Sequence, residues 1–415
     1  MNTVVSFDML QTMGVGALAL VVGMLMTRKI SWLQKFCIPS PVSGGIVFSI
    51  ATLLLYIVFH IEVSFDGTLK DVFMLAFFTS VGFQSNFRVL RKGGKTLLVM
   101  LLLLVTIITM QNVIPLVITK VMGVSQLVGM AAGSISMAGG HGTAGGFSAV
   151  LESMGLRGAG TTSMAAATFG LVAGSMIGGP VAEHLIRRFL TSEHLEPKDY
   201  EIDPAMAGIE SDEASPAGRA KHISSNELEF QQYATATYSL LIVMALGTLV
   251  SKLLEYTGIT FPVYFGALLM AAIIRNIMEF TPLKNKIEIE KIVSVGNISL
   301  SVFLGMAMIS LKLWELQTLA LPLLTILVAQ VAMMVLLTYF VAFKVLGRDY
   351  DAAVLVAGIC GFGLGATPNA MANMSAVCYK YHYSVKPFLI VPIIGAMFVD
   401  LINTGLITFF LNLIG

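Results

Sequence analysis

Apolar stretches long enough to cross a lipid bilayer recur along almost the whole of this 415-residue chain. The hydrocarbon core of a bilayer is about 30 Å thick, and an apolar helix of about 20 residues crosses it. Such stretches are expected to be helices, because lipid offers the backbone no hydrogen-bond partner. We predict ten spans, with the approximate bounds 7–26, 42–61, 69–83, 96–119, 162–184, 235–252, 261–277, 293–311, 319–343 and 387–411.

The scarcity of charged residues supports this interpretation. They make up 12% of the chain, against about 25% in soluble globular proteins, which leaves too little polar surface for a water-soluble fold. The net charge of +1 gives no indication of a nucleic-acid partner. The predicted fold class is therefore an all-α integral membrane protein.

Three segments do not fit the pattern of a plain span. Residues 127–156 and 353–378 are rich in glycine and interrupted, and we expect each to form a re-entrant hairpin. Residues 187–232 are polar and contain three prolines, which is typical of a flexible linker. This linker divides the chain into an N-terminal half, 1–186, and a C-terminal half, 233–415.

The distribution of basic residues predicts the orientation of the spans. If the N-terminus is outside and neither hairpin crosses fully, 20 Lys and Arg fall on the side of the linker and 5 on the other side. Cytoplasmic loops of membrane proteins carry an excess of Lys and Arg. We therefore expect both termini outside the cell and the linker inside.

The two halves of the chain resemble each other at a nearly constant offset. Pro41 corresponds to Pro262, 221 residues later, and Thr143 to Thr367, 224 residues later. Each half holds four spans, a hairpin and a fifth span, and an odd number of spans inverts the second half in the membrane. We predict two inverted repeats of five transmembrane helices, each with a re-entrant hairpin, and the hairpin tips are expected to meet near the midplane. This arrangement is typical of secondary transporters.

The predicted hairpins have the chemistry expected of a binding site. Glycine runs such as Gly139-Gly-His-Gly-Thr143 allow sharp turns and expose backbone N–H groups. A half-helix starting at Thr143 or Pro368 would direct its positive dipole end at the turn, where a carboxylate binds. Facing carbonyl groups would suit Na⁺. The alternative is close helix packing of the Gly-xxx-Gly kind, which explains the spaced glycines of the fifth span but not the glycine runs of the hairpins.

The sequence closely resembles the bacterial sodium/glutamate symporters over nearly its whole length. The resemblance is carried by Ser136-Met-Ala-Gly-Gly-His-Gly-Thr-Ala-Gly-Gly-Phe147, by Gly361-Phe-Gly-Leu-Gly-Ala-Thr-Pro-Asn-Ala-Met-Ala-Asn373 and by Gly296-Asn-Ile-Ser-Leu300. It implies Na⁺-dependent uptake of L-glutamate across the bacterial inner membrane, with Na⁺ as the coupling ion. It also implies a homodimer that works by alternating access, with an elevator type of motion.

The candidate site residues belong to the two hairpins and to polar positions of the eighth and tenth spans. Those expected to contact the substrate are Gly139, Gly140, His141, Gly142, Thr143, Ala144, Thr367, Pro368, Asn369, Asn373, Asp400 and Asn403. Those expected to hold Na⁺ are Ser136, Asn297, Ser301, Gly363 and Thr404.

Asp400 lies near the centre of the tenth predicted span. A charged Asp at that depth costs about 2.5–3.5 kcal/mol on insertion scales, and such residues usually face a cavity. Asn403 and Thr404 lie three and four residues further on, on the same helical face. Two roles fit Asp400, namely pairing with the substrate ammonium group and ligating Na⁺. The alternative is a buried aspartate that fixes helix packing.

Three other functions fit the sequence less well. A Na⁺-coupled dicarboxylate or hydroxycarboxylate transporter of the same architecture is the nearest, but Asp400 favours a substrate with an α-amino group. A channel would need rings of charged side chains or carbonyl groups, and no such repeat is present in the sequence. An enzyme would need paired acids, a metal cluster or a nucleophilic triad, and none is apparent at membrane depth.

Overall fold

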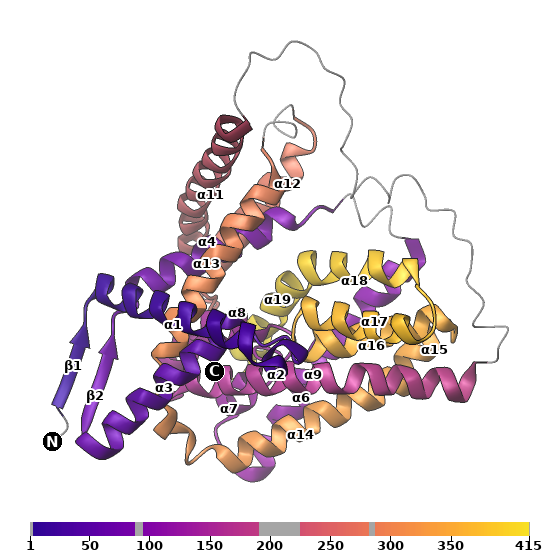
Figure 1. The fold of residues 1–415 in the computed structure, drawn as a ribbon, viewed down its shortest axis with the longest axis horizontal. Helices are drawn as coiled ribbons and strands as arrows, with labels where there is room; N and C mark the ends of the chain where they lie inside the picture. The colour runs from indigo at the N-terminus through magenta and orange to yellow at the C-terminus, as the bar shows by residue number, and fades with distance from the viewer. Residues whose placement is uncertain (1–2, 88–93, 191–224, 282–286, 415) are drawn as a thin grey trace.

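The computed structural model describes residues 3–87, 94–190, 225–281 and 287–414, and nearly all of them are helical (Figure 1). The helices of the N-terminal half are α1 (Met9–Lys29), α2 (Ser31–Lys35), α3 (Ser40–Phe59), α4 (Thr68–Gln84), α6 (Gly94–Met122), α7 (Gln126–Ala131), α8 (Gly140–Ser153) and α9 (Ala159–Phe189). Those of the C-terminal half are α11 (Ser225–Glu255), α12 (Phe265–Met278), α13 (Ile289–Ile309), the 3₁₀-helix η3 (Leu313–Leu316), α14 (Ala320–Leu337), the π-helix η4 (Thr338–Ala342), α15 (Phe343–Val345), α16 (Tyr350–Leu364), α17 (Thr367–Lys380), α18 (Val385–Met397) and α19 (Val399–Ile414).

Seven of the described helices are long and apolar enough to cross a membrane: α1, α3, α6, α9, α11, α13 and the continuous run from α14 to α15. The pair α18 and α19, bent by 46°, makes an eighth span if it is counted as one. The prediction of a multi-spanning helical protein is therefore confirmed, although with fewer long spans than the ten expected. The other two expected spans correspond to α4, with 17 residues, and α12, with 14. Lys70 and Asp71 in the first turn of α4 shorten its apolar part, and α12 begins only after the irregular segment with Pro262.

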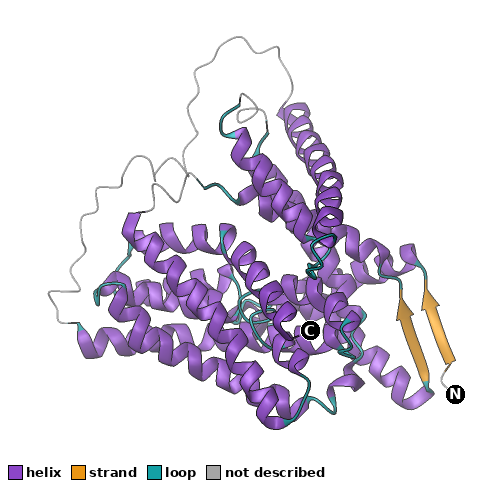
Figure 2. Ribbon diagram, turned by 180° about the vertical axis from the view of Figure 1, so that it is seen from behind, coloured by secondary structure: helices purple, strands orange, loops and turns teal. Residues whose placement is uncertain are grey.

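A pair of short parallel strands departs from the all-helical prediction. β1 (Thr3–Phe7) precedes α1, and β2 (Ile61–Phe65) follows α3. Polar and apolar residues alternate in β2, which is the period of a strand and not of a helix. The Phe7 and Phe65 rings stack with their centroids 5.3 Å apart. Figure 2 shows the two strands at the edge of the molecule, outside the helical body.

The helices form two bundles. The first bundle consists of α1, α3, α4, α11, α12 and α13, which pack on one another. The second bundle consists of α6 to α9 and α14 to α19, and in it α16 packs along α9 and α17. In Figure 1 the orange α12 and α13 lie beside the purple α4, and the yellow α16, α17 and α18 lie beside the magenta α9. Each bundle therefore combines helices from both halves of the chain.

Close helix crossings recur at corresponding places in the first bundle. α1 and α3 touch at Gly23 and Gly44, where an added Cβ would lie 1.9 Å from a backbone oxygen of the facing helix. α11 and α12 touch at Gly247 and Gly266, where an added Cβ would lie 2.2 and 2.4 Å from backbone atoms of the facing helix. Glycine is required at these crossings, because any side chain would separate the two backbones.

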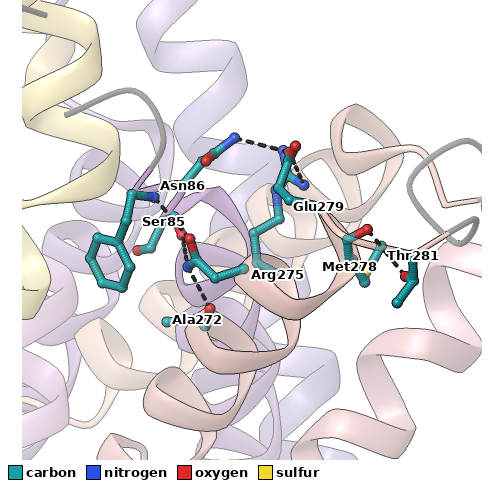
Figure 3. A network of polar contacts seen from close by, with 9 residues as sticks. Ser85, Asn86, Ala272, Arg275, Met278, Glu279 and Thr281 are labelled. Carbon is teal, nitrogen blue, oxygen red and sulfur yellow. Dashed lines mark hydrogen bonds and ion pairs between the residues drawn. The ribbon is translucent and has the colours of Figure 1, made fainter. Parts of the chain in front are cut away.

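A polar network joins the ends of α4 and α12 in the first bundle (Figure 3). Arg275 and Glu279 form an ion pair with 2.8 Å between Nη1 and Oε1, and Asn86 Nδ2 donates to the same Oε1 at 3.0 Å. Asn276 Nδ2 donates to the Ser85 carbonyl oxygen at 2.7 Å. These contacts pair charged and polar groups at the ends of the two shorter helices and fix the helices to each other.

The predicted linker over 187–232 lies largely outside the described residues. Both ends of the predicted range are helical, because α9 continues to Phe189 and α11 begins at Ser225.

Candidate functional site

The glycine-rich segments are two helix pairs, α7 with α8 and α16 with α17. Between the helices of each pair lies a short break, residues 132–139 in the first pair and 365–366 in the second. α8 begins at Gly140 and α17 at Thr367, which is three residues and one residue earlier than the expected starts at Thr143 and Pro368. The two breaks touch. A Cβ added to Gly140, whose φ is +57°, would lie 3.1 Å from the Gly365 carbonyl oxygen. The N-termini of α8 and α17 therefore lie next to each other.

A cavity of about 340 Å³ lies where the two breaks face the first bundle. This volume is in the range of small-molecule binding sites. The second bundle contributes Ala138, Gly139, Gly140, His141, Gly142, Leu171, Phe362, Gly365, Ala366, Thr367, Pro368, Gly395, Val399 and Asp400 to its lining. The first bundle contributes Pro39, Phe77, Asn297, Leu300 and Leu304.

The lining is mostly apolar, with a few polar side chains and without Lys or Arg. Among the described residues around this cavity, none is Lys or Arg, and Asp400 is the only acidic residue. An anion bound here would depend on the N-terminal N–H groups of α8 and α17, which lie at the positive ends of the helix dipoles. The Thr367 hydroxyl and the Asn297 amide add neutral hydrogen-bonding groups. The cavity therefore suits carboxylates at the helix ends and a positive group at Asp400.

The structure places eight of the predicted site residues in the cavity lining. They are Gly139, Gly140, His141, Gly142, Thr367, Pro368, Asp400 and Asn297. The His141 ring is tethered to the second bundle, because its Nε2 lies 2.9 Å from Thr168 Oγ1 of α9. Its imidazole is therefore held at the edge of the cavity by a neighbouring helix.

Thr143 and Asn403 lie directly behind the lining. A Cβ added to Gly139 would lie 2.5 Å from Thr143 Cβ and 2.7 Å from Asn403 Nδ2. The Thr143 hydroxyl lies toward the Asp400 carboxylate. In the described part of the chain, Thr143 Oγ1 and Asn403 Oδ1 are fully buried and make no hydrogen bond of standard geometry. The Thr143 hydroxyl and the Asp400 carboxylate thus lie together, next to the Asn403 side chain. Oxygen groups of this kind are suitable ligands for Na⁺.

Asn369, Asn373 and Ser136 bind neighbouring backbone instead of lining the cavity. The side-chain amides of Asn369 and Asn373 donate to carbonyl oxygens of α9 at 2.8 and 2.9 Å. Ser136 Oγ donates to another carbonyl oxygen of α9 at 2.8 Å. These three residues hold the interrupted segments against α9.

The four remaining predicted residues also lie away from the cavity lining. Ala144 is fully buried, and the Gly363 carbonyl accepts a hydrogen bond from a side-chain amide of α6. Ser301 Oγ donates to a carbonyl of its own helix at 3.0 Å. The Thr404 hydroxyl lies 3.4 Å from the Tyr264 hydroxyl.

Gln111, Asn112 and Gln330 contact the breaks or one another, and the sequence analysis did not single them out. All three are 0% exposed. The first two lie in α6 and the third in α14. A signal was present in the sequence, because amide side chains interrupt the otherwise apolar predicted spans over 96–119 and 319–343.

A second cavity, of about 700 Å³, lies at the far end of α8 and the N-terminus of α9. Its charged lining residues are Lys70, Glu152, Arg157, Lys312 and Glu315. Lys312 Nζ pairs with Glu62 Oε1 at 2.6 Å, and this hydrogen bond raises the pKa of Lys312. Burial raises the pKa of the Glu315 carboxyl. The cavity holds none of the predicted site residues, and its three basic and two acidic side chains partly offset one another.

Comparison with known proteins gives consistent matches over nearly the whole chain. The family model for sodium/glutamate symporters matches residues 5–383. The sodium/glutamate symporter of Escherichia coli (strain K12) is 40% identical over 412 residues, which are 98% of each chain. That of Haemophilus influenzae is 37% identical over 407 residues, covering 97% of this chain and 96% of the other. A solved sodium proton antiporter from Methanocaldococcus jannaschii covers 98% of both chains with 14% identity and a TM-score of 0.44, which is too distant to define the fold.

Proposed function

Since the chain belongs to the sodium/glutamate symporter family, we propose that it carries L-glutamate into the cell together with Na⁺ and binds it in the 340 Å³ cavity. The family consists of transporters and not of enzymes, and its coupling ion is Na⁺.

The observation that carries this proposal is the meeting of two helix N-termini beside one carboxylate. Glutamate has two carboxylates and one ammonium group. The N-termini of α8 and α17 each suit a carboxylate, and Asp400 suits the ammonium group. The ammonium group of an amino acid could pair with Asp400, and a dicarboxylate without an ammonium group could not, so the lining favours an amino acid.

We place a Na⁺ ion behind the lining, between Asp400, the Thr143 hydroxyl and the Asn403 amide oxygen. Of the five Na⁺ ligands expected from the sequence, Asn297 lines the cavity. We add Thr143 and Asn403 as proposed ligands, because their side-chain oxygens are buried and have no hydrogen-bond partner among the described residues. A coupling cation is also needed on electrostatic grounds. Moving the single net negative charge of glutamate into an inside-negative cell costs about 2.3 kcal/mol per 100 mV, which one Na⁺ cancels.

Alternating access would follow from movement of the second bundle against the first, as in an elevator. Glycines of α8 form the contact with the first bundle on one side of the cavity. A Cβ added to Gly145 would lie 2.5 Å from Phe303, and one added to Gly146 would lie 2.4 Å from Tyr264. The absence of side chains on this face of α8 lets the two bundles pack closely, and small sliding movements of packed helices are one form of domain motion.

The two halves would be inverted repeats, and the two interrupted segments re-entrant hairpins. The composition of the bundles supports this proposal, because α1, α3 and α4 from the first half and α11, α12 and α13 from the second occupy the first bundle. The crossing at Gly23 and Gly44 is repeated at Gly247 and Gly266, 224 and 222 residues later. Inverted repeats with broken helices at a central site are typical of secondary transporters.

The topology that goes with these repeats has both termini in the periplasm and the linker in the cytoplasm, with the protein in the bacterial inner membrane. The bias of 20 to 5 in Lys and Arg supports this orientation. A homodimer, as the family resemblance implies, would use the lipid-facing surface. Exposed apolar side chains of α11, such as Leu241 and Leu249, are available for lipid or for a second copy.

Uptake of labelled L-glutamate into proteoliposomes tests the proposed function. An inward Na⁺ gradient should accelerate uptake at least about tenfold over an equal K⁺ gradient, because the downhill entry of Na⁺ drives the anion. Unlabelled glutarate, which has the same two carboxylates but no ammonium group, should compete poorly.

Two outcomes would contradict this assignment. Equal uptake on a proton gradient without Na⁺ would overturn Na⁺ as the coupling ion. Glutarate that competes as well as glutamate would instead support a dicarboxylate transporter.

A further inference from the structure

Two adjacent amide residues, Gln111 and Asn112, lie in α6 between the two breaks of the second bundle. Both are 0% exposed. A polar group in an apolar environment is costly unless it is hydrogen-bonded, so their partners indicate why they are there.

Asn112 holds the first break. Its Oδ1 accepts hydrogen bonds from the Ser134 backbone N–H at 3.3 Å and from the Ser134 hydroxyl at 3.0 Å. The backbones are close here, because a Cβ added to Gly133 would lie 2.8 Å from the Gln111 carbonyl oxygen and 3.0 Å from Asn112 Oδ1. The first break therefore packs directly against α6 and is hydrogen-bonded to it.

Gln111 holds the other break. Its Nε2 donates to the Gly363 carbonyl oxygen at 2.5 Å. Gly363 is two residues before Gly365, which contacts Gly140, the residue directly after the first break. The backbone of Gln111 is itself held from α14, since Gln330 Nε2 donates to its carbonyl oxygen at 2.8 Å.

The same contacts extend to the helix that carries Asp400. Asn403 Nδ2 donates to the Ser134 carbonyl oxygen at 3.0 Å, so Asn112, Ser134 and α19 form one connected chain of hydrogen bonds. One turn of α6 is thus connected by hydrogen bonds to both breaks and, through Asn403, to the helix that carries Asp400.

We propose that Gln111 and Asn112 are positioning residues that fix the separation of the two breaks and thereby set the width of the glutamate cavity. This inference rests on the proposed function, because the two breaks supply the helix ends that would receive the two carboxylates of glutamate. Neither side chain lines the cavity, so both act through the backbone that they hold.

A fixed separation gives selectivity for chain length. Aspartate differs from glutamate by one methylene group, and a fitted site distinguishes one methylene by about 10- to 200-fold. If the breaks were free to shift, the cavity would adapt to either amino acid and the discrimination would fall.

The experiment measures KM and Vmax for Na⁺-driven glutamate uptake, and inhibition by aspartate, in proteoliposomes. The variants are Gln111→Leu, Asn112→Leu and the milder Ser134→Ala, which removes one hydroxyl. Thr119→Val is the matched control, because Thr119 is a buried residue of α6 whose hydroxyl, among the described residues, bonds only to carbonyls of its own helix.

We expect the two leucine variants to raise KM about tenfold or more, since Gln111→Leu loses one hydrogen bond that holds a break and Asn112→Leu loses two. The ratio of aspartate to glutamate inhibition constants should fall toward one. Ser134→Ala should raise KM about twofold to fivefold, and Thr119→Val should keep the KM and the selectivity of the wild type. If the leucine variants do not fold, the KM and the selectivity of the Ser134→Ala variant decide whether the positioning role holds.

A purely structural role predicts something different, namely less folded protein and lower Vmax with unchanged KM and selectivity, and that result would overturn the inference. A wild type without Na⁺-driven uptake contradicts the proposed function. A wild type that transports, with variants that keep its KM, contradicts the positioning role alone.

Discussion

Replacement of Asp400 by asparagine is expected to abolish Na⁺-driven glutamate uptake while the protein still assembles in the membrane. Asparagine has nearly the same shape, so packing around residue 400 is preserved. The negative charge that faces the cavity is lost, and with it the partner of the substrate ammonium group and a ligand of the proposed Na⁺ site. Loss of a charged hydrogen-bonding partner in a site shielded from water costs about 1.5–3 kcal/mol or more, and two bound groups are affected. We expect uptake to fall at least about 100-fold.

Glu152→Gln provides the control for this prediction. Glu152 is an exposed carboxylate that lines the second cavity and not the proposed site, so its neutralisation should leave uptake nearly unchanged. The two roles of Asp400 can be separated by measuring how glutamate and Na⁺ each raise the melting temperature of purified Asp400→Asn protein. Wild-type affinity for both ligands would remove Asp400 from the site.

Replacement of Gly23 by valine is expected to prevent correct assembly of the first bundle. A Cβ at this position would lie 1.9 Å from the Ser40 carbonyl oxygen and 2.9 Å from the Gly44 backbone nitrogen. Because both atoms belong to the backbone of α3, no side-chain rotation relieves the overlap, and α1 and α3 must separate. The cost should exceed the roughly 1–3 kcal/mol of ordinary overpacking. Size-exclusion chromatography of detergent-solubilised protein should show little monodisperse material.

Gly14→Val is the matched control, because Gly14 lies in the same helix and has nothing within 4 Å of an added Cβ. It should yield folded protein with a melting temperature close to that of the wild type. Equal yields and melting temperatures for the two variants would show that the α1–α3 crossing is not as close as the structure has it.

The helical membrane-spanning fold could be predicted because backbone groups in lipid must form their hydrogen bonds within the protein, which long apolar segments do as helices. Long apolar stretches such as 96–119 and 319–343 became α6 and the run from α14 to α15. The predicted bounds of the shorter helices, 69–83 and 261–277, agree with α4 and α12 to within one and four residues. The contacts that hold their ends, such as the ion pair of Arg275 with Glu279, could not be predicted. Residue type alone does not show that such a pair forms.

The strands β1 and β2 could not be predicted for a different physical reason. Each has five residues, and each depends on pairing with a segment more than fifty residues away in the sequence. Strand pairing is a tertiary interaction, so the alternation in Ile61–Phe65 is a weak signal until the partner is known. The predicted spans over 7–26 and 42–61 therefore include only Phe7 of β1 and Ile61 of β2.

The centre of the candidate site was accessible to sequence reasoning because unusual residue types mark it. Glycine runs at a predicted turn and an aspartate at membrane depth identified Gly140 and Asp400, which now line one cavity. The surrounding residues were less accessible. Asn369 and Asn373 turn away from the cavity to bind carbonyl groups of α9, and Gln111 contacts a residue more than 250 positions away. Such choices depend on which backbone groups need a partner, and that requires the fold.

The most direct test of this account is an experimental structure of the protein in a lipid nanodisc with Na⁺ and L-glutamate bound. We predict glutamate density between the N-termini of α8 and α17, with the ammonium group directed at Asp400 and one carboxylate near Thr367. Glutamate bound instead in the second cavity, among Lys70, Arg157 and Lys312, with the first cavity empty, would contradict the assignment of the site.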